Sequence, residues 1–166
     1  MNVTSARDAF RDNPEIEVKS ALPGWVCLWV APDLKVRREV VDFFRSYIHS
    51  VSNELCDKLC TALDELLGNA MEHGCQAERK CGCELTYIRT SRMILFQIRD
   101  AGPGFDLDGL PHAAVNNPPD DPLQHVKARA EAGMRPGGFG ILLVKQIADD
   151  LIYNEQGNEV VLVKYL

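Results

Sequence analysis

Four polar side chains recur at every fourth position near the middle of the chain: Thr61, Glu65, Asn69 and His73. If the segment from Ser52 to Gly74 is helical, each step of four residues turns only about 40° around the axis, so these side chains form one polar ribbon. The ribbon borders an apolar stripe, and a carboxylate and an amide at such an edge can face a pocket. A solvated helix face carries the same pattern, so both interpretations stay open on these residues alone.

Glycines at two places would let the backbone approach a ligand closely. Gly68 lies within the same predicted helix, where glycine costs about 1 kcal/mol relative to alanine, so a close neighbour is expected there. The stretch from Asp100 through Gly102 to Gly104 follows an apolar run and places a carboxylate at the mouth of a predicted strand. An ordinary tight turn is the alternative interpretation of this stretch.

A third motif, Gly137-Gly138-Phe139-Gly140, runs directly into an apolar segment of helical spacing. Free backbone N–H groups and the positive end of the helix dipole would converge there, which suits a phosphate group. A hinge would also explain the glycines. The chain contains no GxxxxGK string, and neither glycine cluster continues as GxGxxG, so the P-loop and the Rossmann dinucleotide site are excluded.

Strands and helices alternate around these motifs. Apolar residues at helical spacing predict helices, and alternating or short continuous apolar runs predict strands. The predicted strands cover residues 15–19, 25–30, 85–89, 93–99, 151–153 and 160–165, and the predicted helices cover 33–48, 52–74 and 141–148. This order predicts an α+β two-layer sandwich, in which a mixed and mostly antiparallel sheet is covered by helices on one face.

The chain of 166 residues has the length of one domain, and we expect residues 1–166 to form one. Residues 107–137 contain five prolines and only one short predicted helix, at 123–132, so this segment is expected to be a functional loop or lid. Lys127, Arg129 and Arg135 could reach a phosphate from it, although a solvated surface position is the simpler role. Residues 1–14 have no apolar block and are expected to be flexible.

Composition limits the possible functions. A formal net charge of −6 argues against direct nucleic-acid binding, which requires a basic face. The apolar runs are much shorter than the roughly 20 residues of a membrane helix, so no membrane span is predicted. The N-terminus does not resemble a secretory signal, and we expect a cytoplasmic protein with reduced cysteines.

The six cysteines fall into groups with different expected roles. Cys56 and Cys60 lie in the apolar stripe of the predicted helix 52–74 and are assigned to the core. Cys75, Cys81 and Cys83 cluster with His73 in the sequence, but their spacing matches no standard zinc knuckle, so reduced thiols are favoured over a zinc site. The sequence leaves the role of these three cysteines open.

The order of the three motifs carries more information than each one alone. Glu65-x3-Asn69 on a helix, Asp100-x-Gly102-x-Gly104 after a strand and Gly138-x-Gly140 before a helix resemble the N box and the two glycine boxes of the GHKL ATPases, which share the Bergerat ATP-binding fold. The superfamily includes gyrase, the heat-shock chaperone, histidine kinases and mismatch-repair ATPases. The stretch 63–73 and the short chain look most like the anti-sigma-factor serine kinases, and the resemblance extends from about Val26 onward.

The resemblance implies ATP and Mg²⁺ as cofactors and assigns roles to individual residues. Asn69 would hold Mg²⁺ against the phosphates, Glu65 would be the general base, and His73 would complete the nucleotide-facing ribbon. Phosphoryl transfer asks mainly for the metal, aligned donors and a group that takes the proton from the incoming hydroxyl. The resemblance thus implies that the residues for metal binding and proton removal lie on one rigid helix.

The glycine boxes would hold the rest of the nucleotide. Asp100 would accept the adenine amino group, and Gly102 and Gly104 would shape the adenine site. Backbone N–H groups around Gly138, Phe139 and Gly140 would bind the phosphates, with the segment 107–137 closing as a lid. Two features depart from the family pattern: the lid is longer and richer in proline, and Phe139 replaces a polar or aliphatic residue.

The implied partners are a sigma factor and an anti-sigma-factor antagonist protein whose serine accepts the phosphoryl group, and homodimers are usual among the resembling kinases. A second hypothesis is a non-catalytic ATP-binding regulator, in which the nucleotide orders the lid and thereby changes a protein-binding surface. The catalytic half of a split histidine kinase is a third, weaker hypothesis, because no helical dimerisation segment with a phosphoacceptor histidine precedes the domain.

Overall fold

A computed structural model of the chain describes residues 5–48, 51–75, 81–104, 113–133 and 138–166. Its centre is a six-stranded sheet with the order β1-β2-β3-β4-β6-β5. The strands are β1 (Ile16–Leu22), β2 (Trp25–Val30), β3 (Cys83–Arg89), β4 (Met93–Asp100), β5 (Asp150–Tyr153) and β6 (Glu159–Tyr165). All neighbouring strands in this sheet are antiparallel, so the expectation of a mixed sheet is wrong for the described residues.

Short turns join β1 to β2, β3 to β4 and β5 to β6, and such turns make the strands of each pair antiparallel. Gly24 turns β1 into β2 with a positive φ of 71°, a conformation in which a side chain is strained. At the β3–β4 turn, the Thr90 side chain accepts hydrogen bonds from the backbone N–H groups of Arg92 and Met93, both at 3.2 Å. β6 then returns beside β4, which places the β5–β6 turn next to the end of β4.

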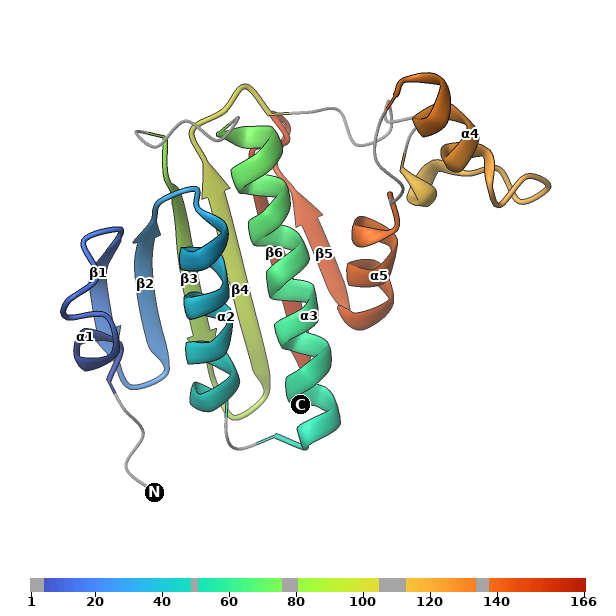
Figure 1. Cartoon of the computed structure of the whole chain (residues 1–166). Coiled ribbons are helices and arrows are strands. Elements are labelled where there is room, and N and C mark those ends of the chain that lie inside the picture. Colours follow the sequence, from blue (N-terminus) through green and yellow to red (C-terminus); the bar gives the residue numbers. More distant parts are fainter. Residues whose placement is uncertain (1–4, 49–50, 76–80, 105–112, 134–137) are drawn as a thin grey trace.

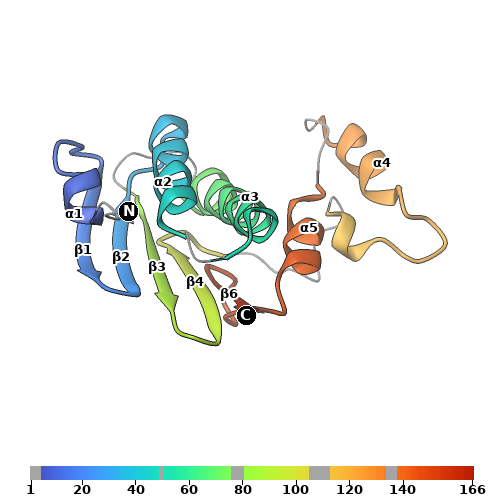
Figure 2. The ribbon, with the colours of Figure 1, turned by 90° about the horizontal axis from the view of Figure 1, so that it is seen from below.

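Helices α2 (Leu34–Tyr47) and α3 (Asn53–Asn69) cover one face of the sheet, and α5 (Gly140–Ile147) packs beside α3 (Figures 1 and 2). Each of the two long helices is capped by the first residue of its predicted range, 33–48 or 52–74. Asp33 accepts hydrogen bonds from the N–H groups of residues 35 and 36, and Ser52 accepts one from the N–H of residue 55. The predicted α+β two-layer sandwich is confirmed.

The core lies between these helices and the sheet. Phe44 of α2 contacts Tyr87 of β3 and Phe96 of β4, with ring centroids 5.2 and 5.4 Å apart. All three side chains are fully buried, as are Leu59 and Leu63 of α3. Cys56 and Cys60 are buried in the same cluster, which confirms their assignment to the core.

The N-terminal segment is more ordered than expected. Ser5 caps a short helix, α1 (Ala6–Ala9), and the Phe10 side chain is buried against Phe43 of α2 with ring centroids 4.9 Å apart. The expectation of a flexible segment over 1–14 is therefore wrong for residues 5–14, because Ala6 and Phe10 are buried in the core and Asn13 donates a hydrogen bond to Glu39 of α2. Residues 1–4 lie outside the described part of the chain.

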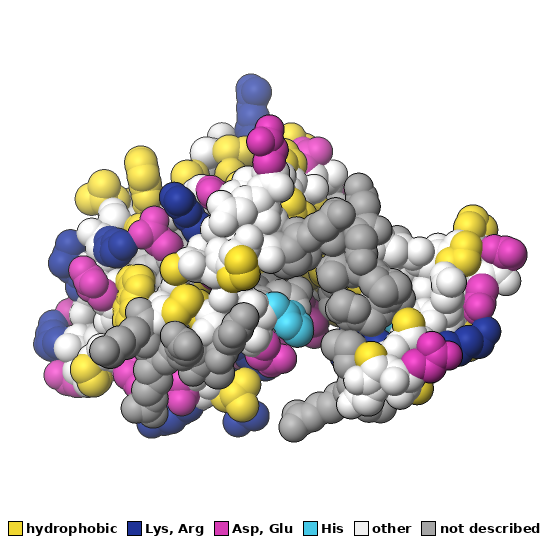
Figure 3. Space-filling view, turned by 90° about the horizontal axis from the view of Figure 1, so that it is seen from above, with side chains coloured by type: hydrophobic (Ala, Val, Ile, Leu, Met, Phe, Trp, Pro, Cys, Tyr) yellow, Lys and Arg dark blue, Asp and Glu magenta, His cyan; other side chains and the backbone are white. Residues whose placement is uncertain are grey.

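The segment before α5 holds two short elements, η2 (Ala114–Asn116) and α4 (Gln124–Glu131). Figure 1 shows α4 to one side of the sandwich, beyond α5, and the view from above shows the same region standing apart from the main body (Figure 3). Among the described residues, no helix has the length and apolar character needed to cross a bilayer.

Candidate functional site

The three predicted motifs meet at one end of the sandwich, where α3 ends, β4 ends and α5 begins. Glu65 of α3 lies against Gly140, the first residue of α5, so closely that a Cβ atom at residue 140 would overlap the carboxylate. Farther along α3, Asn69 lines the same small cavity as Asp100 of β4. The fold thus brings together residues that are between 31 and 75 positions apart in the sequence.

Glu65 is half-buried. Burial, helped by the neighbouring Asp64 carboxylate, raises the pKa of Glu65 above its usual value, and the guanidinium of Arg37 on α2 opposes that rise. Arg37 Nε lies 3.0 Å from Asp64 Oδ1, an ion pair whose N–H direction does not meet hydrogen-bond geometry. A carboxyl group with a raised pKa is better suited to take up a proton than an ordinary exposed carboxylate.

The same arginine explains the glycine in α3. A Cβ atom at Gly68 would overlap the Arg37 guanidinium, and Gly68 is buried under α2. The close neighbour that this glycine admits is therefore a side chain of the protein, and the interpretation of Gly68 as a place for ligand approach is wrong. Glycine here lets Arg37 reach Asp64, and more distantly Glu72 at 3.7 Å.

Asn69 carries an unpaired polar group that lines the cavity. Its Nδ2 atom is buried and has no hydrogen-bond partner among the described residues. Leaving such a group unpaired costs about 1–3 kcal/mol, so an amide in this position is suited to bind something that enters the cavity. The amide fits the role of a metal or phosphate ligand that the resemblance implies.

The cavity beside Asn69 is small, at about 20 Å³, and is lined by Leu66, Asn69, Ala70, Ile98, Asp100, Tyr153, Gly157, Asn158, Glu159 and Val160. This volume holds about one water molecule. A nucleotide base enters it only if the lining side chains move apart. Burial raises the pKa of Tyr153 to about 12, so this phenol lines the cavity as a neutral group at physiological pH.

Asp100 is 9% exposed, and burial raises the pKa of its carboxyl group. The backbone N–H of Gly102 donates to Asp100 Oδ1 at 2.8 Å and works against that rise. A Cβ atom at Gly74 would overlap the Asp100 carboxylate, and one at Gly102 would overlap the Gly74 carbonyl oxygen. These glycines therefore allow residue 74, which lies beyond the end of α3, to pack closely on the end of β4.

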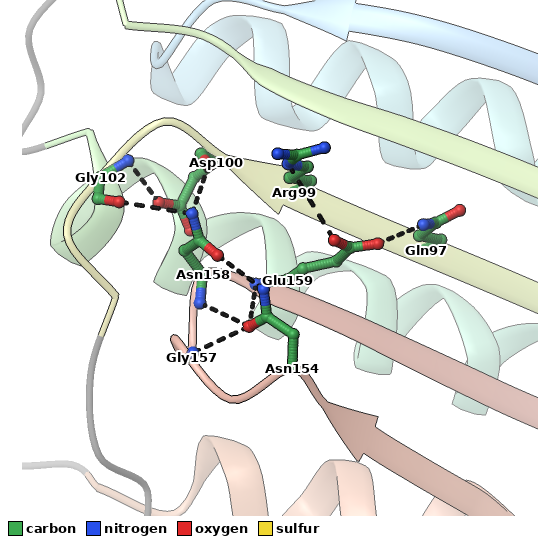
Figure 4. A network of polar contacts seen from close by, with 8 residues as sticks. All are labelled: Gln97, Arg99, Asp100, Gly102, Asn154, Gly157, Asn158 and Glu159. Carbon is green, nitrogen blue, oxygen red and sulfur yellow. Dashed lines mark hydrogen bonds and ion pairs between the residues drawn. The ribbon is translucent and has the colours of Figure 1, made fainter.

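Asn158 is a site residue that sequence reasoning missed. Figure 4 shows its side chain reaching from the β5–β6 turn to the backbone after β4. The Asn158 Nδ2 donates to the backbone carbonyl oxygens of Asp100 and Gly102 at 3.3 and 3.4 Å. The backbone carbonyl oxygen of Asn158 accepts from the Asp100 N–H at 3.0 Å. Asn154 Nδ2 in turn donates to Asn158 Oδ1 at 2.8 Å. The sequence shows only that Asn158 lies between the predicted strands 151–153 and 160–165.

Gly104 lies farther from the cavity. It has a φ of 77°, and a Cβ atom there would overlap the carbonyl oxygen of Gln156 in the β5–β6 turn. The structure thus explains Gly104 by a left-handed backbone and by a close backbone neighbour. Gly104 is not among the residues that line the cavity.

The second glycine box, Gly138-x-Gly140, lies between the segment 113–133 and the rest of α5. Gly138 has a φ of 90°, and its carbonyl oxygen accepts a hydrogen bond from the Ala114 N–H at 2.8 Å. Phe139 occupies the N-cap position of α5, is 48% exposed and meets the ring of His125 edge-on, with ring centroids 4.4 Å apart. The N-cap residue, Phe139, makes no side-chain hydrogen bond to α5. The first N–H groups of a helix have no partner within it, so they suit an anionic ligand.

His125 is fully buried although it lies on α4. Asn117 Oδ1 accepts from the His125 N–H at 2.9 Å, and Asn117 Nδ2 lies 2.6 Å from His125 Nδ1. The aromatic residue that departs from the family pattern, Phe139, therefore holds α4 against α5. Lys127 pairs with Asp121 at 2.9 Å within the same segment, and Arg135 lies outside the described residues.

His73 does not line the cavity that Asn69 and Asp100 share. After Asn69 the helix widens into a π-helical turn, η1 (Ala70–Gly74), which ends with a hydrogen bond from the Cys75 N–H to the Ala70 carbonyl. A π turn has i→i+5 hydrogen bonds, so residue 73 points in a different direction from the one that a continued α-helix would give it. His73 is exposed, and Thr61 is also exposed, with its hydroxyl donating to the Asp57 carbonyl.

Comparisons with known proteins were made on the whole chain. The family model described as "Histidine kinase-like ATPase domain" matches residues 30–164. The serine-protein kinase RsbW of Oceanobacillus iheyensis is 26% identical over 116 residues, which cover 69% of this chain and 68% of that protein. The serine-protein kinase RsbW of Listeria monocytogenes serovar 1/2a is 28% identical over 116 residues, which cover 69% of each chain.

Proposed function

Because the chain belongs to the histidine kinase-like ATPase domain family, we propose that it binds Mg-ATP where α3, β4 and α5 meet and transfers the γ-phosphoryl group to a serine or threonine of a protein partner. The observation that carries the proposal is the buried, unpaired amide of Asn69 in the cavity that Asp100 also lines. The similarity to two serine-protein kinases supports a kinase over a simple ATPase.

Each part of the site has a role in this proposal. Asn69 holds Mg²⁺, Asp100 accepts the adenine amino group beside Gly102 and Gly104, and the N–H groups at Gly138, Phe139 and Gly140 bind phosphate oxygens. Bound Mg²⁺ supplies charge neutralisation for the phosphates. The protein supplies orientation and an anion site at the start of α5.

Glu65 is the proposed general base. Its carboxylate lies against the start of α5, beside the proposed phosphate site, and burial raises its pKa above the usual value of a glutamate. A base in that place can take the proton from a serine hydroxyl that approaches the phosphate. The role of His73 in nucleotide binding is not supported by its exposed position on the π turn.

The proposed partners are a sigma factor, which the protein sequesters, and an antagonist protein, which carries the phosphoacceptor. We place the protein in the cytoplasm and propose a homodimer. The face of the sheet opposite α2 and α3 supports the homodimer, because it is covered by none of the described helices and presents the exposed apolar side chains of Trp25, Ile152 and Tyr165.

A non-catalytic ATP-binding regulator is the second candidate. The contact between His125 and Phe139 favours it, because a change at the proposed phosphate site would be passed directly to α4. Glu65→Ala separates the two functions. A kinase would lose phosphoryl transfer and keep its ATP affinity, whereas a regulator would keep both its ATP affinity and its partner binding.

The test is calorimetric titration of Mg-ATP into the wild type, Asn69→Ala and a matched control, Asn53→Ala. Asn53 begins the same helix at its opposite, exposed end. We expect binding to the wild type and the control and a loss of at least tenfold in affinity for Asn69→Ala, because a hydrogen bond to a charged group contributes about 1.5–3 kcal/mol. Absence of binding by the wild type, or equal binding by all three proteins, would contradict the proposed site.

A further inference from the structure

Two cysteines at the edge of the site lie unusually close together. Cys75 follows the π turn η1, and Cys81 comes shortly before β3. Their sulfur atoms are 2.6 Å apart, and both residues are free thiols. A disulfide bond is about 2.05 Å long, so the two sulfurs need to move by only a fraction of an ångström to form one.

We propose that Cys75 and Cys81 are a redox-active thiol pair that a low-molecular-weight disulfide, such as oxidised glutathione, converts reversibly into an intramolecular disulfide. The Cys81 thiolate attacks the glutathione disulfide, forms a mixed disulfide and releases one glutathione thiol. The Cys75 thiolate then attacks the Cys81 sulfur and releases the second glutathione. The protein loses two electrons and two protons, and these are recovered in the two glutathione thiols.

The burial of the two residues sets the order of attack. Cys81 is partly exposed and meets the reagent, whereas Cys75 is 2% exposed. Burial, together with the hydrogen bond from Cys81, raises the pKa of Cys75 to about 12, so its thiol is a poor first nucleophile. Once Cys81 carries glutathione, Cys75 is the thiol that lies within reach of it.

The third nearby thiol does not compete. Cys83 is fully buried at the start of β3, and burial beside Asp100 raises its pKa to about 12. In the described part of the chain, no three side chains of the metal-binding types gather into a possible metal site. Thiol exchange between two residues is therefore the chemistry that the arrangement supports.

The bridge would connect two segments that frame the Asp100 carboxylate. Gly74, next to Cys75, packs on that carboxylate, and Cys83, two residues beyond Cys81, pairs with Asp100 across β3 and β4. Closing a loop of seven residues restricts the unfolded chain, and the loop-entropy relation then predicts a rise of about 5–10 °C in Tm on oxidation. The same relation makes oxidation about 50-fold more favourable in the folded chain than in the unfolded chain.

The experiment equilibrates the whole chain with defined ratios of reduced and oxidised glutathione, with and without urea, and then alkylates the remaining thiols. Intact mass counts the alkylated thiols. A tryptic map identifies the bridge, because Arg79 and Lys80 place Cys75 and Cys81 in different peptides. Cys81→Ser is the test variant and Cys83→Ser the matched control, since both change the same peptide.

We expect the folded wild type and Cys83→Ser to lose two alkylatable thiols at a glutathione ratio at which the urea-unfolded chain keeps them. Cys81→Ser should keep all five of its thiols. The buried pair Cys56 and Cys60 is an internal control that should remain alkylatable after denaturation. A stable glutathione adduct on Cys81, a bridge that Cys83→Ser removes, or equal oxidation with and without urea would overturn the proposal. No nucleotide is used, so the outcome is independent of the proposed function.

Discussion

The contact between Glu65 and Gly140 gives the sharpest test of the site geometry. Gly140 begins α5 without a positive φ, so alanine fits its backbone and should stabilise the chain by about 0.4–1 kcal/mol through the unfolded state. However, the new Cβ atom would overlap the Glu65 carboxylate, which must retreat by about 1 Å to reach ordinary van der Waals separation. The substitution therefore displaces the proposed base while leaving the fold in place.

The assay is a double-mutant cycle of Gly140→Ala and Glu65→Ala, with the free energy of unfolding measured in urea. In the wild type the gain from alanine is offset by the displaced carboxylate, and in the Glu65→Ala background the full gain should appear. We expect a coupling of at least about 0.5 kcal/mol between the two sites. If Gly140→Ala changes the unfolding free energy equally in both backgrounds, the contact between Glu65 and Gly140 does not exist as described.

The same variant tests the proposed kinase activity. A catalytic group misplaced by about 1 Å can lose about 100-fold in rate, so Gly140→Ala should lower phosphoryl transfer strongly although its stability stays close to that of the wild type. The rate of phosphorylation of a serine-containing partner is the measurement. Full activity in Gly140→Ala would refute Glu65 as the base.

Two further predictions concern the end of β4. Asn158→Ala removes a buried side chain that donates to the carbonyls of Asp100 and Gly102, and it should lower the free energy of unfolding in urea by about 1–3 kcal/mol; an unchanged midpoint would contradict this network. Burial raises the pKa of Asp100 in the folded chain above its ordinary value of 3.8, so the folded state holds this proton more tightly than the unfolded state. The free energy of unfolding that this group contributes is therefore lost as the pH rises from below 3.8 through the raised pKa. Asp100→Asn should flatten that fall in urea titrations at several pH values, and an unchanged pH dependence would show that Asp100 is not the group responsible.

Much of the fold could be predicted from short stretches of sequence. The caps Asp33 and Ser52 and the apolar stripe with Cys56 and Cys60 depend on residues within a few positions of one another, and the structure confirms them. The segment 5–14 was misjudged because its order depends on contacts of Ala6, Phe10 and Asn13 with residues that are distant in the sequence.

The candidate site could be predicted only in part, because residues with the same local pattern have different neighbours in space. Glu65 and Asn69 lie at the site. His73 lies on the π turn η1, which the spacing of the residues did not predict. A glycine within a helix is compatible with close approach of a ligand, yet Gly68 packs on the side chain of Arg37.

By itself, the sequence determined the class of fold, the helix starts and the positions of the glycine motifs, since capping, periodicity and backbone freedom are properties of neighbouring residues. The tertiary structure alone decided that Asn69, Asp100 and Asn158 share one cavity and that the thiols of Cys75 and Cys81 touch. Those contacts arise where β6 pairs with β4 and where the end of α3 packs on β4, and such long-range packing leaves no periodic signal in the chain.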